Sequence, residues 1–414
     1  MYNSIREVII MKHYDLCIAG ACASGLAAAL SAAKNHPGIR IAVLEKLPRT
    51  GKKILVTGNG RCNLTNVNAV PGSYNNPAFA APILEKYSPE KVIGFFGSLG
   101  LLTYTDSAGR VYPRSNTASS VLDSLRFAAE KYGIDIFTET PVTSAVKKDG
   151  EFIINNEFSS DKFIIATGGK ASSPQGSDGS GYPLAKSFGH IITPLFPSLV
   201  PVNTKPDEVR GLKGVRAANV RLTFSAEDIN ASSEGELLFT ENGISGICAM
   251  ELASFAAKAV AKKIPAYIKV DFLPEMAEES LEKYLSDTAR SKCGEPIDSF
   301  LTGILPKPLG IAVLKKAQVY LGGSQVEEIS AGMAKAIAKE IKEFTLTVTG
   351  TKGFENAQVT KGGVDTSDIN PETMESLLVP GLYFCGEIND IDGLCGGFNL
   401  QWAFASGLLA GELG

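Results

Sequence analysis

The sequence predicts an α/β protein whose parallel sheet is interrupted by an inserted domain of antiparallel strands and helices. Three observations carry this prediction. The apolar segment 14–19 leads through a glycine turn at 20–25 into an alanine-rich helix. Strands with period-two alternation begin only after about residue 194, and glycine-rich sequence returns at 381–401. We therefore expect a first domain at 12–193 and 349–414, with an insert at 194–348.

Composition narrows the class of protein. The 414 residues are 44% hydrophobic, and 40 basic against 44 acidic residues give a net charge of −4, which disfavours a nucleic-acid partner. No run approaches the ~18–20 apolar residues of a membrane helix, and no secretory signal is present. The seven cysteines are scattered and histidines number three, so we expect reduced thiols and no metal site. These features predict a cytoplasmic protein and leave its oligomeric state open.

The first βαβ unit predicts dinucleotide binding. A strand at 14–19, a helix at 26–34 and a strand at 40–44 are joined by the turn at 20–25 and end on Glu45. A helix N-terminus after such a turn offers free N–H groups to a pyrophosphate, and a carboxylate at the second strand end accepts ribose hydroxyls. Cys22 stands where the usual pattern has its middle glycine, so its side chain must point away from the pyrophosphate or push it outward.

The next segment, 51–66, combines glycines, small polar side chains and the cations Lys52, Lys53 and Arg61. Such a loop suits phosphates or a flat heterocycle, and the alternative is a solvated surface loop. Helices are expected at 90–99 and 117–131, followed by a parallel strand at 134–137.

Three short strands are then expected, at 142–147, 151–154 and 162–166. A meander between parallel strands is typical of FAD-binding domains and not of plain NAD-binding dehydrogenases.

The insert and the return segment differ in sequence pattern: strands of the insert alternate with period two, whereas the return segment is rich in glycine. The insert is expected to contain strands at 220–224, 268–272 and 344–348 and helices at 277–290, 307–319 and 328–343. We expect it to supply substrate contacts. The return segment has a strand at 382–385 that closes on Gly386-Glu387 and a final helix at 399–411. The N-terminus of this helix would stabilise negative charge on the pyrimidine edge of a reduced flavin.

Five blocks of sequence resemble one known family. They are GACASG (20–25) with Glu45, GKKILVTGNGRCNLTN (51–66), ATGG (166–169), TKGGVD (360–365) and GLYFCGEINDIDGLCGGFNLQWAFASG (381–407). Together they are similar to the BaiN-like/aminoacetone-oxidase-like family of bacterial FAD-binding oxidoreductases over most of the chain. The resemblance implies a glutathione-reductase-like Rossmann FAD-binding domain carrying an inserted β-barrel-like plus helical substrate domain.

The resemblance also implies roles for individual residues. The pyrophosphate and adenosine ribose would lie at the glycine turn and Glu45, the adenine at the Val142 backbone, and the pyrimidine edge at 399–401. The implied FAD-binding residues are Gly20, Ala23, Ser24, Gly25, Glu45, Lys46, Lys53, Gly60, Arg61, Cys62, Asn63, Val142, Thr167, Gly168, Gly386, Glu387, Asn399, Leu400 and Gln401. The chain departs from the family at Glu241 and Ile247, where a His and a Pro are usual.

Catalytic residues are not assigned by the sequence, and the candidates are Arg61, Tyr112 and Arg114. Arg61 either steadies the flavin, pairs with an anionic substrate or forms a structural ion pair, whereas Tyr112 and Arg114 either face the flavin or end a hairpin. Cys62 has no CxxC partner, which disfavours a catalytic disulfide. Trp402 is expected to pack, and His190 is expected at a helix end.

These inferences converge on an FAD-dependent oxidoreductase that moves a hydride between flavin N5 and a small organic substrate. Two substrate classes stay open: an activated C=C bond reduced with NADH or NADPH as donor, or an amine oxidised by oxygen. A structural or sensory FAD is a further alternative. A plain NAD-binding dehydrogenase is disfavoured by the meander and by the 381–401 block.

Overall fold

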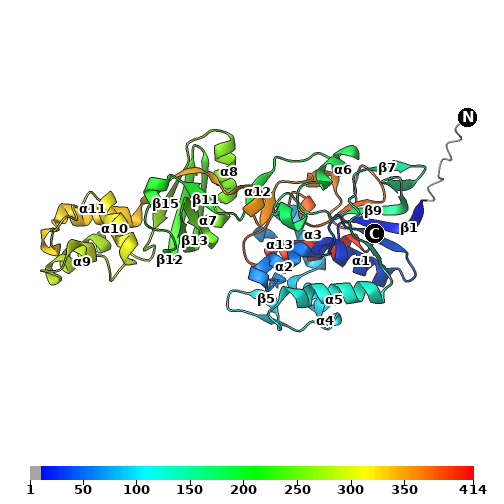
Figure 1. Ribbon diagram of the computed structural model, residues 1–414, viewed down its shortest axis with the longest axis horizontal. Helices are drawn as coiled ribbons and strands as arrows, with labels where there is room; N and C mark the ends of the chain where they lie inside the picture. Colours follow the sequence, from blue (N-terminus) through cyan, green and yellow to red (C-terminus); the bar gives the residue numbers. More distant parts are fainter. Residues whose placement is uncertain (1–10) are drawn as a thin grey trace, which may run out of the picture. The chain divides into compact units, whose positions relative to one another are not determined.

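The computed structural model describes residues 11–414, which fold as two compact units (Figure 1). The sheet unit combines the chain up to Leu195 with Val359–Gly414, and the barrel unit is Phe196–Gln358. The barrel unit extends beyond the expected residue 348 because its last strand continues to Thr351 and the short helix Gly353–Asn356 follows it. Residues 1–10, which precede the predicted first domain, lie outside the described residues.

A parallel sheet forms the centre of the sheet unit and confirms the α/β prediction. Its strand order is β6-β2-β1-β9-β8-β7, with β18 beside β9. All pairs among β6, β2, β1, β9 and β18 are parallel, whereas β7 and β8 form an antiparallel meander on the first half of β9. The strands are β1 (Lys12–Ala19), β2 (Ile41–Leu44), β6 (Asp135–Phe137), β7 (Ala145–Lys148), β8 (Glu151–Ile154), β9 (Phe158–Ile165) and β18 (Leu382–Phe384).

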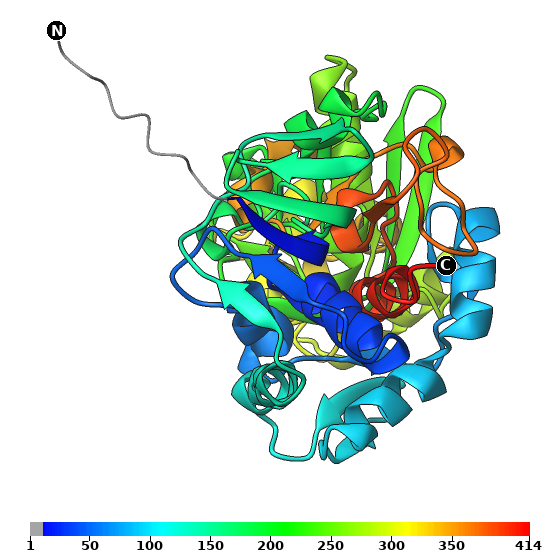
Figure 2. The same ribbon diagram turned by 90° about the vertical axis from the view of Figure 1, so that its right-hand side faces the viewer.

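Two helices from opposite ends of the chain pack side by side against this sheet. They are α1 (Ala23–Asn35) and α13 (Phe398–Ala410), which appear in blue and red in Figure 2. A Cβ atom at Gly407 of α13 would lie 2.4 Å from the backbone oxygen of Ser24, and one at Gly411 would lie 2.2 Å from that of Ala28. The two helices approach this closely because α13 has no side chains at these points.

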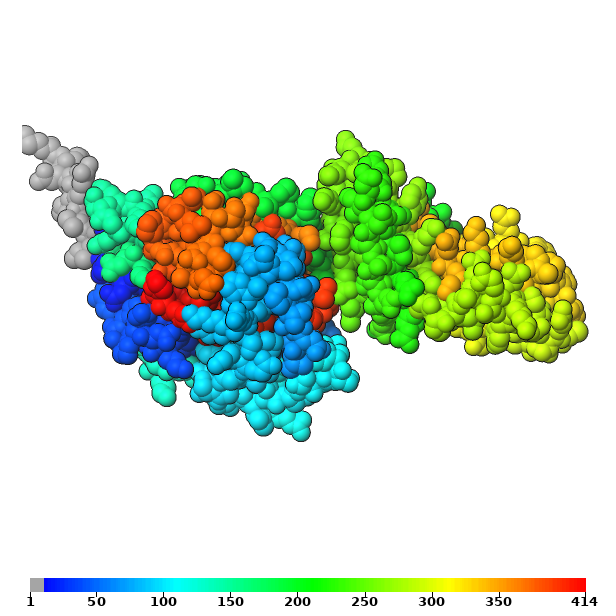
Figure 3. All heavy atoms as spheres, turned by 180° about the vertical axis from the view of Figure 1, so that it is seen from behind, coloured from blue at the N-terminus to red at the C-terminus, as the bar shows by residue number. Residues whose placement is uncertain are grey.

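Further helices and short strands complete the sheet unit. Figure 3 shows residues 359–414, in orange and red, set among segments of the first half of the chain in blue and cyan. These elements are α2 (Lys52–Val56), β3 (Thr65–Asn66), α3 (Pro77–Lys86), α4 (Pro89–Ser98), β4 (Thr103–Thr105), β5 (Arg110–Pro113), α5 (Ala118–Lys131), α6 (Gly181–Ser187) and β17 (Val359–Lys361). The predicted loop 51–66 therefore contains a one-turn helix, α2.

The barrel unit contains a closed six-stranded barrel in the order β11-β14-β13-β12-β15-β16. Alternate residues of its strands, such as Leu222, Ile268 and Leu346, are fully buried inside. The strands are β10 (Phe196–Ser198), which lies outside the barrel, β11 (Val202–Thr204), β12 (Arg216–Ala226), β13 (Ile229–Thr240), β14 (Gly243–Ser245), β15 (Tyr267–Asp271) and β16 (Phe344–Thr351). The barrel-plus-helices prediction for the insert is confirmed.

Helices flank the barrel, and α9, α10 and α11 form a separate group beyond its strands (Figure 1). The helix predicted at 307–319 ends at Lys316 because Gln318 adopts a left-handed φ of 60°. The helices are α7 (Ile247–Glu251), α8 (Ala253–Ala261), α9 (Glu278–Ser291), α10 (Lys307–Lys316), α11 (Ala331–Lys342) and α12 (Gly353–Asn356). In residues 11–414, none of the helices has the length and apolarity needed to cross a bilayer.

The α1–α13 contact yields a stability prediction. Gly407→Ala should lower the free energy of unfolding by about 1–3 kcal/mol, because the new methyl group overlaps the Ser24 backbone. Gly94→Ala in α4 is the matched control, since nothing lies within 4 Å of its added Cβ; it should raise stability by about 0.4–1 kcal/mol. Urea unfolding of both variants measures this. Equal effects would contradict the packing account.

Candidate FAD-binding site

The glycine turn brings backbone N–H groups together at the carboxyl end of β1. Gly20 has a φ of +106°, and a Cβ atom there would lie 2.6 Å from the Ala166 oxygen. A Cβ atom at Gly25 would lie 1.9 Å from the Gly20 oxygen, so both positions require glycine. Leu26 makes the first intrahelical bond of α1, to the Cys22 oxygen. The N–H groups of residues 23–25 are therefore free to bind an anion, as a pyrophosphate site needs.

Cys22 is the N-cap of α1, and its thiol turns toward α2. The thiol lies close to Ala23, Ile54 and Lys53, and burial raises its pKa. The side chain at this non-glycine position is therefore accommodated between α1 and α2.

The Glu45 carboxylate is held at the end of β2 by two backbone donors. Oε2 accepts a hydrogen bond from the Ala21 N–H at 2.9 Å, and Oε1 accepts one from the Leu47 N–H at 2.9 Å. Each oxygen keeps a further acceptor site, as two ribose hydroxyls require. Lys46 beside it forms an ion pair with Asp178 at 2.6 Å.

Polar groups without partners also occur at Val142 and beside Gly168. Val142 precedes β7, and neither its N–H nor its carbonyl has a hydrogen-bond partner among residues 11–414. Thr167 and Gly168 follow the carboxyl end of β9, and Gly168 has a φ of +74°. The Ser177 hydroxyl faces Gly168, is buried and has no partner in the described chain. Buried polar groups without partners are rare, which indicates a ligand here.

Lys53 and Glu387 form a charged pair across the predicted course of the cofactor. Nζ lies 2.6 Å from Oε2, and both side chains are less than one-fifth exposed. The Thr360 N–H donates to the other Glu387 oxygen at 2.7 Å, and Lys53 also donates to the Ala171 carbonyl. Sequence reasoning did not single out Thr360, although it lies in the quoted TKGGVD block.

Gly386 is clamped to the two helices that carry the site. Its N–H donates to the Ser406 hydroxyl, and its carbonyl accepts from the Trp402 indole at 3.0 Å. A Cβ atom at Gly386 would lie 2.4 Å from the Ser24 hydroxyl. Trp402 is buried and packs, as expected from the sequence.

The N-terminus of α13 faces Asn63. Gly397, the N-cap of α13, has a φ of 105°, and its added Cβ would lie 2.9 Å from Asn63 Oδ1. That oxygen is buried without a partner, and the Asn63 N–H also has none among the described residues. The first-turn N–H groups of α13 are free donors at the same point. The free N–H groups of α13, together with the unpaired Oδ1 and N–H of Asn63, fit the donors and acceptors on the pyrimidine edge of a flavin.

Two predicted pyrimidine-edge side chains are used within the protein. Asn399 accepts from the Gly393 N–H and donates back to the Gly393 carbonyl. Gln401 accepts from the Thr65 hydroxyl and donates to the Tyr87 carbonyl. Residues 399 and 400 can therefore offer a ligand their backbone N–H groups. The Gln401 N–H is not free, because it donates to the Gly397 carbonyl.

The catalytic candidates form a stack that also includes Tyr104. The Arg61 guanidinium lies 4.6 Å from the Tyr112 ring centroid, Tyr112 stacks on Tyr104 at 5.8 Å, and Arg114 lies 5.9 Å from the Tyr104 ring. The structure thus brings Arg61 and Tyr112 into contact and separates Arg114 from Arg61 by two rings. Gly60 precedes Arg61 with a φ of 80°, and Cys62 follows it with a φ of 58°.

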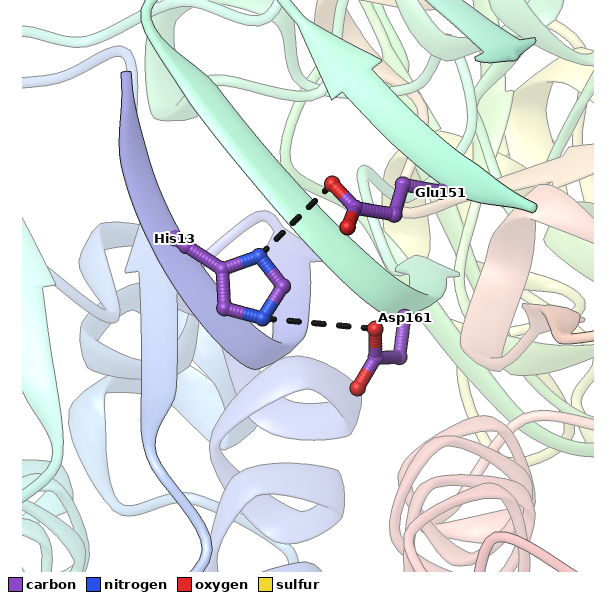
Figure 4. Close-up of side chains that lie close together, drawn as sticks. All are labelled: His13, Glu151 and Asp161. Carbon is purple, nitrogen blue, oxygen red and sulfur yellow. Dashed lines mark ion pairs between the residues drawn. The ribbon is translucent and has the colours of Figure 1, made fainter. Parts of the chain in front are cut away.

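A histidine with two carboxylates lies away from this site, on one face of the sheet (Figure 4). His13 Nδ1 lies 3.7 Å from Glu151 Oε2, and His13 Nε2 lies 4.0 Å from Asp161 Oδ1. These three side chains come from β1, β8 and β9, and no ion is present between them.

The fold and site together define a Rossmann-type FAD-dependent oxidoreductase. The chain matches the family described as "HI0933-like protein Rossmann domain" over residues 14–413, and it belongs to this family. This confirms the family inferred from the sequence motifs.

Curated relatives match nearly the whole chain. A 3-dehydro-bile acid delta(4,6)-reductase of Clostridium scindens is 38% identical, covering 95% of this chain and 97% of the relative. A ribosomal RNA dihydrouridine synthase of Escherichia coli is 29% identical, covering 96% of each chain. An open-conformation flavocytochrome c3 fumarate reductase shares the fold, with a TM-score of 0.52, 16% identity, and coverage of 97% of this chain and 78% of that one.

The Lys53–Glu387 pair yields a binding prediction. Lys53→Met should weaken FAD binding by about tenfold or more, because it leaves the Glu387 carboxylate without its cation. Lys52→Met is the matched control, since Lys52 is exposed and donates only to the Pro174 carbonyl; it should leave the affinity unchanged. Fluorescence titration of the apoprotein with FAD measures both. Equal affinities for the two variants would contradict the assigned role.

Thiol reactivity distinguishes a redox-active Cys62 from a packed one. Burial raises the pKa of Cys62 to about 12, so at pH 8 on the order of one thiol in ten thousand is ionised. Iodoacetamide at pH 8 should therefore modify the exposed Cys293 and spare Cys62. Mass spectrometry of tryptic peptides measures the order of labelling. Labelling of Cys62 as fast as Cys293 would restore the redox interpretation.

Proposed function

We propose that this protein reduces a C=C bond conjugated to a carbonyl group, with NADH or NADPH as electron donor. FAD, when bound, supplies hydride transfer through its N5 atom. The single observation that carries the flavin part is the N-terminal turn of α13 facing the unpaired amide of Asn63. A helix N-terminus stabilises negative charge beside it, which favours a flavin that cycles to its reduced form.

The chain's own residues contribute in two ways. Glu45, Val142 and the turn of α1 offer binding groups for the adenosine and pyrophosphate of the cofactor. The Lys53–Glu387 pair and the clamped Gly386 keep the carboxyl end of β18 rigid next to α1. These contacts would hold the reactive ring in one orientation, which is what rapid hydride transfer requires.

The names of the relatives support the choice of reaction. One is a reductase of delta(4,6) double bonds in a 3-dehydro-bile acid, and another makes dihydrouridine in ribosomal RNA. Both reactions saturate a C=C bond that is conjugated to a carbonyl group. A hydride acceptor of this electronic type is common to both, although the molecules that carry it differ greatly.

Charge supports a small molecule as the substrate. The barrel unit carries 19 Lys and Arg against 21 Asp and Glu, so it has no basic excess with which to bind RNA phosphates. The alternative, reduction of uridine in RNA, is supported by the 29% identity to the dihydrouridine synthase over the full chain. Oxidation of an amine by oxygen and a structural FAD are the remaining alternatives.

One titration separates these functions. Under nitrogen, NADH or NADPH should bleach the flavin absorption, and a 3-keto-4-ene bile acid should restore it in a 1:1 ratio. Restoration by RNA transcripts carrying uridine, with dihydrouridine detected by mass spectrometry, would support the alternative substrate. A flavin that neither donor reduces, or one that only oxygen reoxidises, would contradict the proposed reductase.

A further inference from the structure

Arg61 differs from the other described arginines because it is partly buried and also lacks a carboxylate partner. Five arginines form ion pairs with carboxylates: Arg110, Arg126, Arg216, Arg221 and Arg290. Three further unpaired arginines, Arg40, Arg49 and Arg210, are exposed, as is Arg114. In the described chain, Arg61 alone is both shielded from full exposure and without a carboxylate within 4.0 Å.

The Arg61 guanidinium is held by one hydrogen bond and by an aromatic ring that packs against one of its two faces. Its Nε donates to the Gly58 carbonyl at 3.3 Å, and its plane is supported by the Tyr112 ring at 4.6 Å. Tyr112 is 3% exposed and is itself supported by Tyr104. Stacking occupies the face of a guanidinium and leaves its edge N–H groups free to donate. A partly desolvated cation with free donors is suited to an anionic or strongly polarised oxygen.

Arg61 lies at the flavin end of the candidate site. It is two residues from Asn63, whose unpaired amide faces the N-terminus of α13. The backbone on either side is constrained, because Asn59 and Cys62 both have left-handed φ values, 55° and 58°. The loop thus presents Arg61 and Asn63 from one short, conformationally restricted segment.

We propose that Arg61 binds an oxyanion of the substrate, and this inference rests on the proposed reductase function. Addition of a hydride to the far carbon of a C=C–C=O unit, with NADH or NADPH as the reductant, would move the π electron pair to the carbonyl oxygen. The edge N–H groups of Arg61 would stabilise the enolate charge that forms there. A proton from solvent then adds to the carbon next to the carbonyl, which restores the C=O bond. A substrate carboxylate is the other oxyanion with this chemistry.

Tyr112 is a positioning residue in this scheme, because it acts through Arg61. Its ring supplies the stack and its hydroxyl is not required. Tyr112→Phe should therefore retain the function of the pair, whereas Tyr112→Leu should impair it.

The test measures binding to the FAD-loaded protein without turnover. Two probes distinguish the sources of the oxyanion: 4-nitrophenolate imitates an enolate, and benzoate offers a carboxylate. Equilibrium dialysis gives the Kd for each probe, and flavin absorption and circular dichroism confirm that each variant is loaded and folded. Arg126→Gln is the control, because Arg126 is exposed and paired with Asp123 on α5.

Arg61→Gln should weaken binding of at least one probe by about tenfold to a hundredfold, and Arg61→Lys by less. Tyr112→Leu should weaken probe binding several-fold. Tyr112→Phe and Arg126→Gln should have Kd values close to that of the unsubstituted protein. Unchanged Kd values for both probes in loaded Arg61→Gln would overturn the proposal. If Arg61→Gln does not retain FAD, equal Kd values for Tyr112→Leu and Tyr112→Phe would overturn it instead.

The outcome is separate from that of the reductase titration. If probe binding depends on Arg61 but neither NADH nor NADPH reduces the flavin, the proposed reductase function is contradicted and the oxyanion site remains. If the protein is an active reductase but its Kd values for the probes do not change in Arg61→Gln, only the inference about Arg61 is contradicted.

Discussion

The close approach of α1 to α13 is the contact on which the cofactor site depends. The Ser24 backbone touches Gly407, and the Ser24 hydroxyl lies against Gly386 at the end of β18. In the proposed FAD site, the chain before the barrel unit would supply the turn for the pyrophosphate, and the chain after it would supply the helix N-terminus for the flavin ring. Because α13 has glycine where α1 crosses it, the two halves meet at backbone distance. The barrel unit can thus interrupt the sheet unit in sequence without separating the two halves of the site.

Charge is distributed along this site in a consistent way. Free helix N–H groups stand at both ends, at α1 for a pyrophosphate and at α13 for a pyrimidine edge. Between them Glu387 has its charge neutralised by Lys53, so a carboxylate can stand close to a phosphate-bearing ligand. Arg61 is another cation of the same loop, and it has no carboxylate partner among residues 11–414. Among the buried polar atoms without a partner in the described chain, Asn63 Oδ1 lies beside the first turn of α13, where a flavin ring would supply a partner.

Local pattern was sufficient for the parallel sheet, the meander and most helices, because apolar runs and glycine turns mark them directly. It was insufficient for β13, whose stretch Ala231–Gly235 is small and polar, and for α2, which is one turn long and begins after a left-handed Gly51. Cofactor contacts made by backbone, such as the turn at Gly20, follow from glycine position. The side-chain partners of Gln401 do not, because Thr65 and Tyr87 lie more than 300 residues earlier in the chain.

The most direct test of this account is a crystal structure of the protein with FAD bound. The account predicts the pyrophosphate on the N–H groups of residues 23–25, the ribose on Glu45, and the pyrimidine edge between Asn63 and the first turn of α13. A flavin ring placed elsewhere, with Asn63 Oδ1 still unpaired, would contradict it.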